Sequence, residues 1–282
     1  MRNRIKARGR LVAGSSAFVL VVMLTGGVAH ASAQGANRPK YVALGSSFAS
    51  GPSIPDTVDQ ACGRSSRNYA NLVATKLGLA LTDVSCQGAT TDVVLATQLA
   101  AVTSDTKYVT LTIGGNNINY SLSTILCARQ PPGTSCQGNG VDPAAATANL
   151  EQLEGQLTDT LRAVKKAAPS AKVFLVAYPR VLPADGSTCP PQNPMVAQDS
   201  RFIADLGAQL QQRSIAAAKA AKVAFVDAYT PKGHDVCSPE AERWIEGAAP
   251  ESPAFVFHPN ERAMQAEAAL LVEAMKVKHK GH

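Results

Sequence analysis

The stretch Lys40–Gly51, which reads K-Y-V-A-L-G-S-S-F-A-S-G, decides the fold in our interpretation. Its first residues, Lys40–Leu44, form a short apolar run that predicts a buried β-strand. The run stops at Gly45 and is followed by Ser46 and Ser47. Open α/β sheets present ligands and nucleophiles at the carboxyl ends of their strands, so Ser47 is a candidate catalytic nucleophile. An ordinary turn is the alternative, because glycine and serine are common turn residues.

Further short runs of apolar and β-branched residues predict strands, and they alternate with segments of helical spacing. The predicted strands are Leu79–Cys86, Lys107–Ile113, Lys172–Tyr178 and Val223–Ala228. The predicted helices are Ser66–Leu77, Val93–Ala101, Ala144–Ala167, Val196–Ala221 and a last helix from Pro259 or Asn260 to Val277. This alternation is typical of a parallel sheet covered on both faces. We therefore expect one doubly wound α/β domain over residues 40–277.

Long segments that contain proline and cysteine follow the last three predicted strands. They span residues 118–141, 180–195 and 229–257, and we expect them to be irregular. Because the carboxyl ends of parallel strands lie at the same edge of a sheet, these segments would collect there. We expect them to form the pocket that binds the substrate.

The first 31 residues have the three parts of a Sec-type signal peptide. A basic stretch at Arg2–Arg10 precedes an apolar stretch at about Leu11–Leu24, and Ala29-His30-Ala31 forms a cleavage site. We expect residues 1–31 to be removed, residues 32–39 to be a flexible leader, and the protein to be extracellular or in the cell envelope. An uncleaved anchor is the alternative. The basic tail, residues 278–282, is expected to be a solvated end.

The basic net charge of the whole chain comes mainly from its first residues. The net charge is +6, but without residues 1–31 the chain has 22 Lys and Arg against 21 Asp and Glu. A nearly neutral protein gives no electrostatic support for a nucleic-acid partner. We expect at most transient contact with a membrane or lipid surface.

Six cysteines in an exported chain indicate disulfides, and six cysteines allow 15 connectivities. Pairing each cysteine with its nearest neighbour gives Cys62–Cys86, Cys127–Cys136 and Cys189–Cys237. A zinc site is the competing interpretation, but the chain has neither a C-x-x-C motif nor a cluster of cysteine and histidine. We expect no metal and no cofactor.

Glycine-containing turns end three predicted strands: Gly45-Ser46-Ser47, then Gly88, then Gly114-Gly115-Asn116-Asn117. These turns should converge at one edge of the sheet. Only two histidines, His234 and His258, lie inside the predicted domain and could serve Ser47 as a base. His258 stands directly before the last predicted helix, where it can reach back over that edge.

A serine hydroxyl is a poor nucleophile until a base takes its proton during attack. The oxyanion that forms must then meet hydrogen-bond donors that are already in place. Backbone N–H groups of serine and glycine, and an asparagine side chain, can supply such donors.

These residues resemble the SGNH, or GDSL-type, serine hydrolases, and among them the secreted actinobacterial lipases and esterases with three disulfides. The resemblance extends over nearly all of residues 40–276. It is carried by the following blocks: Gly45-Ser46-Ser47-Phe48 with Gly51, Gly88 in C-Q-G-A-T-T, Gly114-Gly115-Asn116-Asn117, and His258-Pro259. The stretch from Cys62-Gly63-Arg64-Ser65 to Tyr69 also matches.

The resemblance implies a three-layer α/β/α sandwich with a five-stranded parallel sheet of flavodoxin-like topology. It implies ester hydrolysis through a serine ester intermediate, with Ser47 as nucleophile and His258 as base. The implied oxyanion hole consists of the Ser47 N–H, the Gly88 N–H and the Asn116 side chain. A monomer that acts on a small-molecule or lipid ester is expected.

The chain departs from the family pattern at Ser46, Asn117 and Phe255, where the family usually has aspartate. The third departure removes the usual carboxylate partner of the histidine. Some members of the branch are thought to orient the imidazole with a main-chain carbonyl, and the Phe255 carbonyl is our candidate. Asp235, beside His234, is the alternative acid.

The leading hypothesis is a secreted carboxylic ester hydrolase, a lipase or esterase. A polysaccharide or glycan O-deacetylase on the same fold is the alternative within the enzyme class. A non-catalytic, exported acyl- or glycan-binding protein is the alternative from another class, and the three departures motivate it. Trp244 could stack on a sugar, but packing is the simpler expectation.

Overall fold

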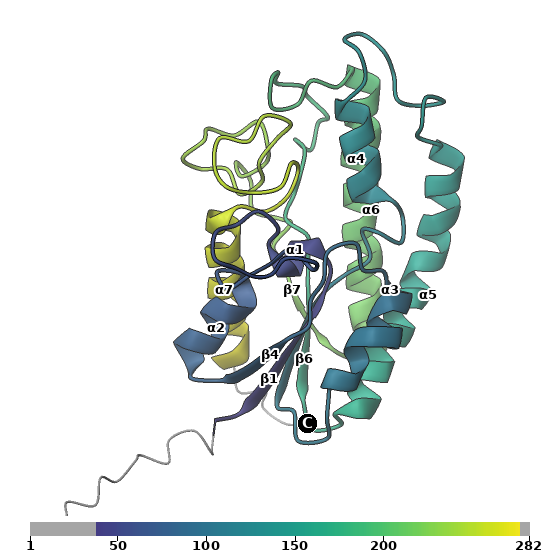
Figure 1. Cartoon of the computed structure of the whole chain (residues 1–282). Coiled ribbons are helices and arrows are strands. Elements are labelled where there is room, and N and C mark those ends of the chain that lie inside the picture. Colours follow the sequence, from purple (N-terminus) through teal and green to yellow (C-terminus); the bar gives the residue numbers. More distant parts are fainter. Residues whose placement is uncertain (1–37, 277–282) are drawn as a thin grey trace, which may run out of the picture. The chain divides into compact units, whose positions relative to one another are not determined.

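The computed structural model describes residues 38–276, and its centre is a parallel β-sheet (Figure 1). The five strands of this sheet are β1 (Lys40–Gly45), β4 (Ala80–Asp83), β5 (Tyr108–Thr112), β6 (Lys172–Val176) and β7 (Ala224–Val226). Their order across the sheet is β4-β1-β5-β6-β7, and every pairing is parallel. This is the flavodoxin-like order, so the predicted α/β fold and topology are confirmed.

Some predictions fall outside the described residues. They are the signal peptide at residues 1–31, most of the leader at residues 32–39, and the basic tail at residues 278–282. Among the helices that the structure describes, none is long and apolar enough to cross a membrane.

Helices cover both faces of the sheet, which gives three layers (Figure 1). On one face lie α2 (Tyr69–Leu77) and α7 (Glu261–Lys276), and on the other lie α5 (Pro143–Ala167) and α6 (Ala197–Ala221). Alternate side chains of β6 pack on the two opposite faces of the sheet. Val173 and Leu175 pack in one core cluster, whereas Phe174 and Val176 pack in the other.

The helix predicted at Ala144–Ala167 is α5, and its apolar stripe is buried against the sheet and α6. Its members are Leu150, Leu153, Leu157, Leu161 and Val164, all at most 3% exposed. Burying one such side chain stabilises the fold by about 1.5–3 kcal/mol. The helix begins as its sequence predicts, because the Asp142 side chain accepts a hydrogen bond from the Ala144 N–H and Pro143 occupies the first turn.

The segment after β5 is not irregular throughout, and that prediction is wrong. It contains α4 (Tyr120–Ala128), which packs against α6. Buried Tyr120, Ser123, Thr124 and Cys127 recur at helical spacing, and Gly207 of α6 leaves room for the Tyr120 ring. The prolines and glycines farther along the segment hid this pattern.

Other elements are short or broken. The predicted helix at Val93–Ala101 is a turn of α-helix (α3, Thr91–Val93), a π-helical turn (η1, Val94–Gln98) and a 3₁₀ turn (η2, Leu99–Ala101). The loop after β1 begins with the short helix α1 (Ser47–Ser50). It also contains a small antiparallel pair, β2 (Thr57–Asp59) with β3 (Arg64–Ser65).

The six cysteines pair as nearest neighbours: Cys62–Cys86, Cys127–Cys136 and Cys189–Cys237. Each bond joins segments at or beyond the carboxyl edge of the sheet. The first bond lies beside the Gly88 turn, where the Gln87 N–H also donates to the Cys62 carbonyl. The disulfides therefore fix the loops around the predicted site.

Candidate active site

Ser47 is held in place by the turn that ends β1. Gly45 has φ 135°, and a Cβ there would lie 2.5 Å from the Thr112 carbonyl oxygen, so only glycine fits. The Ser46 N–H donates to the same Thr112 carbonyl at 2.9 Å. The buried amide of Gln98 accepts from the Gly45 N–H at 2.8 Å and donates to the Gly45 carbonyl at 3.0 Å. Ser47 thus begins α1 on a fixed backbone.

Ser47 and His258, which are 211 residues apart in the chain, are in direct contact. The Oγ of Ser47 lies 2.8 Å from Nε2 of His258, and both residues are at most 4% exposed. The other ring nitrogen, Nδ1, lies 2.8 Å from the Val256 carbonyl oxygen. A carbonyl can only accept, so Nδ1 carries the proton and Nε2 is free to accept the Ser47 proton.

The prediction that the Phe255 carbonyl orients the imidazole is wrong. That carbonyl accepts the His258 backbone N–H at 3.1 Å, across a tight turn, and is therefore not directed at the ring. Phe257 in this turn has the left-handed φ of 56°. The turn brings the carbonyl of Val256, the residue that follows Phe255, to Nδ1 of His258. A main-chain carbonyl does orient the ring, but it comes one residue later.

The alternatives Asp235 and His234 are not part of this pair. The Asp235 carboxylate accepts the Cys237 N–H at 3.0 Å, and burial raises its pKa. The His234 ring stacks on Trp244 with 4.1 Å between ring centroids, and its Nδ1 lies 2.7 Å from the Glu242 carbonyl. Trp244 therefore packs against the His234 ring, as the simpler expectation for this residue had it.

Aromatic rings surround the His258 imidazole. The Phe48 centroid lies 4.9 Å from the imidazole centroid, and the Phe255 ring lies 5.1 Å away, edge-on. Burial lowers the pKa of His258 to about 4, and the hydrogen bond to the Val256 carbonyl opposes this shift without cancelling it. The imidazole is therefore neutral at neutral pH, as a general base must be.

The predicted oxyanion donors lie on the turns that follow β1, β4 and β5. Within residues 38–276, neither the Ser47 N–H nor the Gly88 N–H donates to a protein acceptor. Gly88 has φ 78°, and nothing lies within 4 Å of a Cβ built there. Asn116 Nδ2 donates to the Ala89 carbonyl at 2.9 Å, which joins it to the Gly88 turn and leaves a second amide hydrogen for a ligand.

The two remaining departures from the family pattern have neutral partners. Ser46 Oγ lies 3.0 Å from the Tyr178 hydroxyl, which accepts the Gly115 N–H at 3.1 Å. Asn117 Nδ2 donates to Thr91 Oγ1 and to Gln156 Oε1, at 2.7 and 2.8 Å. Ser46 and Asn117 therefore join neighbouring segments by neutral hydrogen bonds, without the charge of an aspartate.

Three contributors to the site were not found from the sequence: Gln98, Tyr178 and the Val256 carbonyl. Tyr178 stands at the end of a predicted strand, and this position could have marked it. Gln98 gave no signal, because it lies in a segment that was predicted to be a regular helix. Its π-helical turn, a feature that is frequent at functional sites, is not visible in the sequence.

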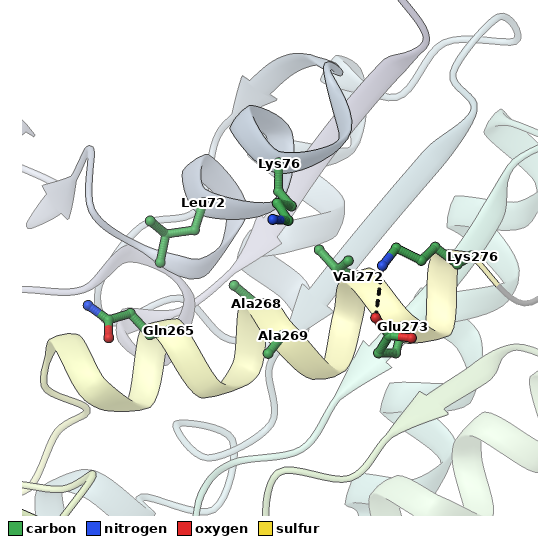
Figure 2. A pocket seen from close by; sticks show the side chains of 8 residues that line it. All are labelled: Leu72, Lys76, Gln265, Ala268, Ala269, Val272, Glu273 and Lys276. Carbon is green, nitrogen blue, oxygen red and sulfur yellow. Dashed lines mark hydrogen bonds and ion pairs between the residues drawn. The ribbon is translucent and has the colours of Figure 1, made fainter.

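Two other features of the described residues lie apart from this site. Cys127, Cys136 and Asp199 come together, but the cysteines share a disulfide and Asp199 accepts the Cys136 N–H, so the group is not a metal site. A hollow of about 520 Å³ lies between α2 and α7, lined by Leu72 and Val272 among others (Figure 2). None of its lining residues is a predicted site residue.

Known proteins resemble this chain in sequence and in fold. Lipase 2 of Streptomyces coelicolor is 31% identical over 258 residues, which cover 86% of this chain and 88% of that protein. A lipase of Streptomyces rimosus is 33% identical over 239 residues, which cover 81% and 85%.

Solved structures of Streptomyces proteins also resemble the structure of this chain. An extracellular lipase from Streptomyces rimosus has a TM-score of 0.71 and 28% identity, covering 85% of this chain and all of that one. Phospholipase A1 from Streptomyces albidoflavus NA297 has a TM-score of 0.72 and 28% identity, covering 86% of this chain and all of that one. The model of the GDSL-like lipase/acylhydrolase family matches residues 43–266, most of the chain, and so the protein belongs to this family.

Proposed function

We propose that this protein hydrolyses carboxylic esters, as a lipase or esterase, with Ser47 as nucleophile and His258 as general base. The observation that carries the proposal is the contact of 2.8 Å between Ser47 Oγ and His258 Nε2, in a ring whose Nδ1–H is held by the Val256 carbonyl. The lipase and esterase names of the relatives support the same reaction class.

In the first half of the reaction, Nε2 takes the Ser47 proton while Oγ attacks the ester carbonyl carbon. The oxyanion accepts hydrogen bonds from the Ser47 N–H, the Gly88 N–H and the Asn116 side chain. When the intermediate collapses, the bond to the alcohol oxygen breaks and His258 gives its proton to the leaving alcohol. An acyl ester of Ser47 remains.

In the second half, water attacks this ester while Nε2 takes a proton from it. The second tetrahedral intermediate releases the carboxylic acid, and the proton returns to Ser47 Oγ. Throughout, the Val256 carbonyl holds the Nδ1–H and fixes the tautomer. A carbonyl stabilises imidazolium less than a carboxylate does, so this dyad relies more on the oxyanion donors.

We propose a lipid ester as the substrate, because the relatives include two lipases and a phospholipase A1. We also propose that the protein is exported and acts as a monomer. Three disulfides are typical of exported proteins, and an extracellular lipase is among the similar structures.

The test replaces Ser47 and a matched serine of the same helix. Ser47→Ala should abolish turnover of p-nitrophenyl esters and labelling by a fluorophosphonate. Ser50→Ala should leave both intact, because Ser50 Oγ is buried without a hydrogen-bond partner among the described residues. Unchanged activity in Ser47→Ala would reject the mechanism.

A panel of substrates then separates the lipid esterase from its alternatives. p-Nitrophenyl esters of increasing chain length are compared with phospholipid and acetylated xylan. Turnover of xylan alone would indicate a polysaccharide O-deacetylase. Failure of every ester, together with failure of Ser47 to take up the fluorophosphonate, would indicate a non-catalytic binding protein.

A further inference from the structure

The segment that carries His258 is held on one side by the backbone of Glu246. The Glu246 N–H donates to the His258 carbonyl at 3.1 Å, and the Phe257 N–H donates to the Glu246 carbonyl at 2.9 Å. Ile245 and Pro259 continue this pairing as an antiparallel bridge. A displacement of Glu246 would therefore displace His258 with it.

One peptide plane connects Glu246 to the imidazole. The peptide group between Val256 and Phe257 has its carbonyl at His258 Nδ1 and its N–H on the Glu246 carbonyl. Phe257 keeps its left-handed φ of 56° although it is bulky and buried. Such a conformation costs about 1–3 kcal/mol and persists only where the surroundings fix it. Glu246 supplies one of those fixed contacts.

The Glu246 side chain anchors this backbone in turn. Its carboxylate is fully buried. Oε1 accepts hydrogen bonds from Ser252 Oγ at 2.6 Å and from Asn260 Nδ2 at 2.9 Å, and Oε2 accepts the Glu251 N–H at 2.9 Å. Arg243 Nη1 lies 3.7 Å from Oε2. One side chain thus joins the loop before His258 to the start of α7.

The groups around this carboxylate favour its charged form. Burial raises the pKa of Glu246, but the hydrogen bonds from Ser252, Asn260 and the Glu251 N–H, together with the charge of Arg243, outweigh burial and lower the pKa below its usual value. Glu251 is the other charged group here, and it pairs with Arg243. Every hydrogen-bond partner of the Glu246 carboxylate is a donor in the structure, so an amide in place of the carboxylate would direct its NH₂ group at a donor.

We propose that Glu246 is a positioning residue for His258, whose buried carboxylate fixes the peptide plane that orients the imidazole. The proposal rests on the proposed ester hydrolysis and extends it. In a Ser-His-Asp triad, a carboxylate holds the ring directly. Here the carboxylate acts through the backbone and touches neither the ring nor the substrate.

The first test is Glu246→Gln, a substitution that keeps the shape and removes the charge. Misplacement of a catalytic group by about 1 Å can cost about a hundredfold in rate, so we expect kcat and kcat/KM to fall at least about tenfold with KM unchanged. A looser segment also admits water to His258, so the acid limb of kcat/KM should move to higher pH. Glu240→Gln, at an exposed position of the same segment, should change neither quantity.

A milder variant covers the case in which Glu246→Gln does not fold. Ser252→Ala removes one hydrogen bond to the carboxylate and should shift kcat and the acid limb in the same directions, by less. If folded Glu246→Gln keeps the kcat and the acid limb of the unsubstituted protein, the positioning role is rejected. If that variant does not fold, an unchanged Ser252→Ala rejects it. Absence of ester turnover by the unsubstituted protein would instead reject the proposed function.

Discussion

The proposed base, His258, lies in an apolar setting, and this should show in the pH dependence of the reaction. With burial lowering its pKa to about 4, the imidazole stays neutral far below its usual titration range. We expect kcat/KM for a p-nitrophenyl ester to be constant from neutral pH to about pH 5 and to be half lost near pH 4. An acid limb near pH 6.5 would contradict the burial of the ring in the free protein.

Phe255 should influence this pH dependence through its ring. The ring lies edge-on to His258 and is itself 42% exposed, so it forms the outer cover of the imidazole. Phe255→Ala should admit water, raise the His258 pKa and move the acid limb of kcat/KM to higher pH. Leu122→Ala, which removes another exposed apolar side chain, should leave the limb in place. Equal profiles for both variants would show that Phe255 does not shield the ring.

At the scale of residues, the sequence predicts side-chain chemistry better than backbone geometry. That Ser47 and His258 come together could be predicted, because few residue types can act as nucleophile and base and the chain offers only two histidines inside the predicted domain. The role of the Val256 carbonyl could not be predicted, because every residue has a carbonyl and the sequence does not distinguish among them. Which one reaches Nδ1 depends on the φ of Phe257, which the sequence does not reveal.

At the scale of elements, α7 buries an acid that has no partner. Glu267 is fully buried near Tyr69 of α2, and neither carboxylate oxygen has a hydrogen-bond partner among the described residues. Burial therefore raises the pKa of Glu267 well above its usual 4.5. The folded protein keeps this proton, whereas the unfolded chain releases it above about pH 4.5. The contribution of Glu267 to stability is thus complete at low pH and is lost as pH rises.

Glu267→Gln should remove this pH dependence. Above pH 4.5, the free energy of unfolding of the unsubstituted protein should fall relative to the variant by about 1.4 kcal/mol per pH unit, until Glu267 ionises in the folded state. Urea unfolding from pH 4 to pH 9 measures the difference. Glu273→Gln, at an exposed position of the same helix, is the control. A constant difference between the unsubstituted protein and Glu267→Gln would reject the buried, protonated state.

Elements were predictable where one face of a long segment is buried. The leucines of α5 give a regular stripe over 25 residues, so its position follows from the sequence. The stripe of α4 stands next to a run of prolines and glycines that obscures it, and this helix was missed. The break of the segment at Val93–Ala101 was missed for another reason. The π-helical turn at Val94–Gln98 places the Gln98 side chain on the backbone of Gly45. This is a tertiary contact, which the local spacing of apolar residues does not encode.

At the scale of the whole molecule, the alternation of five strands with helices predicts a parallel sheet that is covered on both faces. The order of the strands is implied by the family resemblance, and the sheet has that flavodoxin-like order. The residues alone leave the pairing of the cysteines more open, since six allow 15 connectivities. The observed bonds join nearest neighbours in the chain, as predicted.

Removing the three disulfides one at a time should lower stability in one order and activity in another. Each can be removed by a double substitution of cysteine to serine. The loops that they close span 24, 9 and 48 residues for Cys62–Cys86, Cys127–Cys136 and Cys189–Cys237. Loop-closure entropy predicts losses of about 3.5, 2.6 and 4 kcal/mol in the free energy of unfolding. Removal of Cys189–Cys237 should therefore destabilise the fold most.

Activity should follow another order, because only Cys62–Cys86 lies beside the Gly88 turn. The Gln87 N–H donates to the Cys62 carbonyl and the Ala89 N–H donates to the Cys86 carbonyl, so this disulfide fixes both sides of Gly88. Loss of one oxyanion donor costs about 3–4 kcal/mol of transition-state stabilisation. We expect kcat to fall most in the variant without Cys62–Cys86, measured at a temperature where all three variants are folded. If kcat instead follows the order of stability, the Gly88 turn does not depend on this bond.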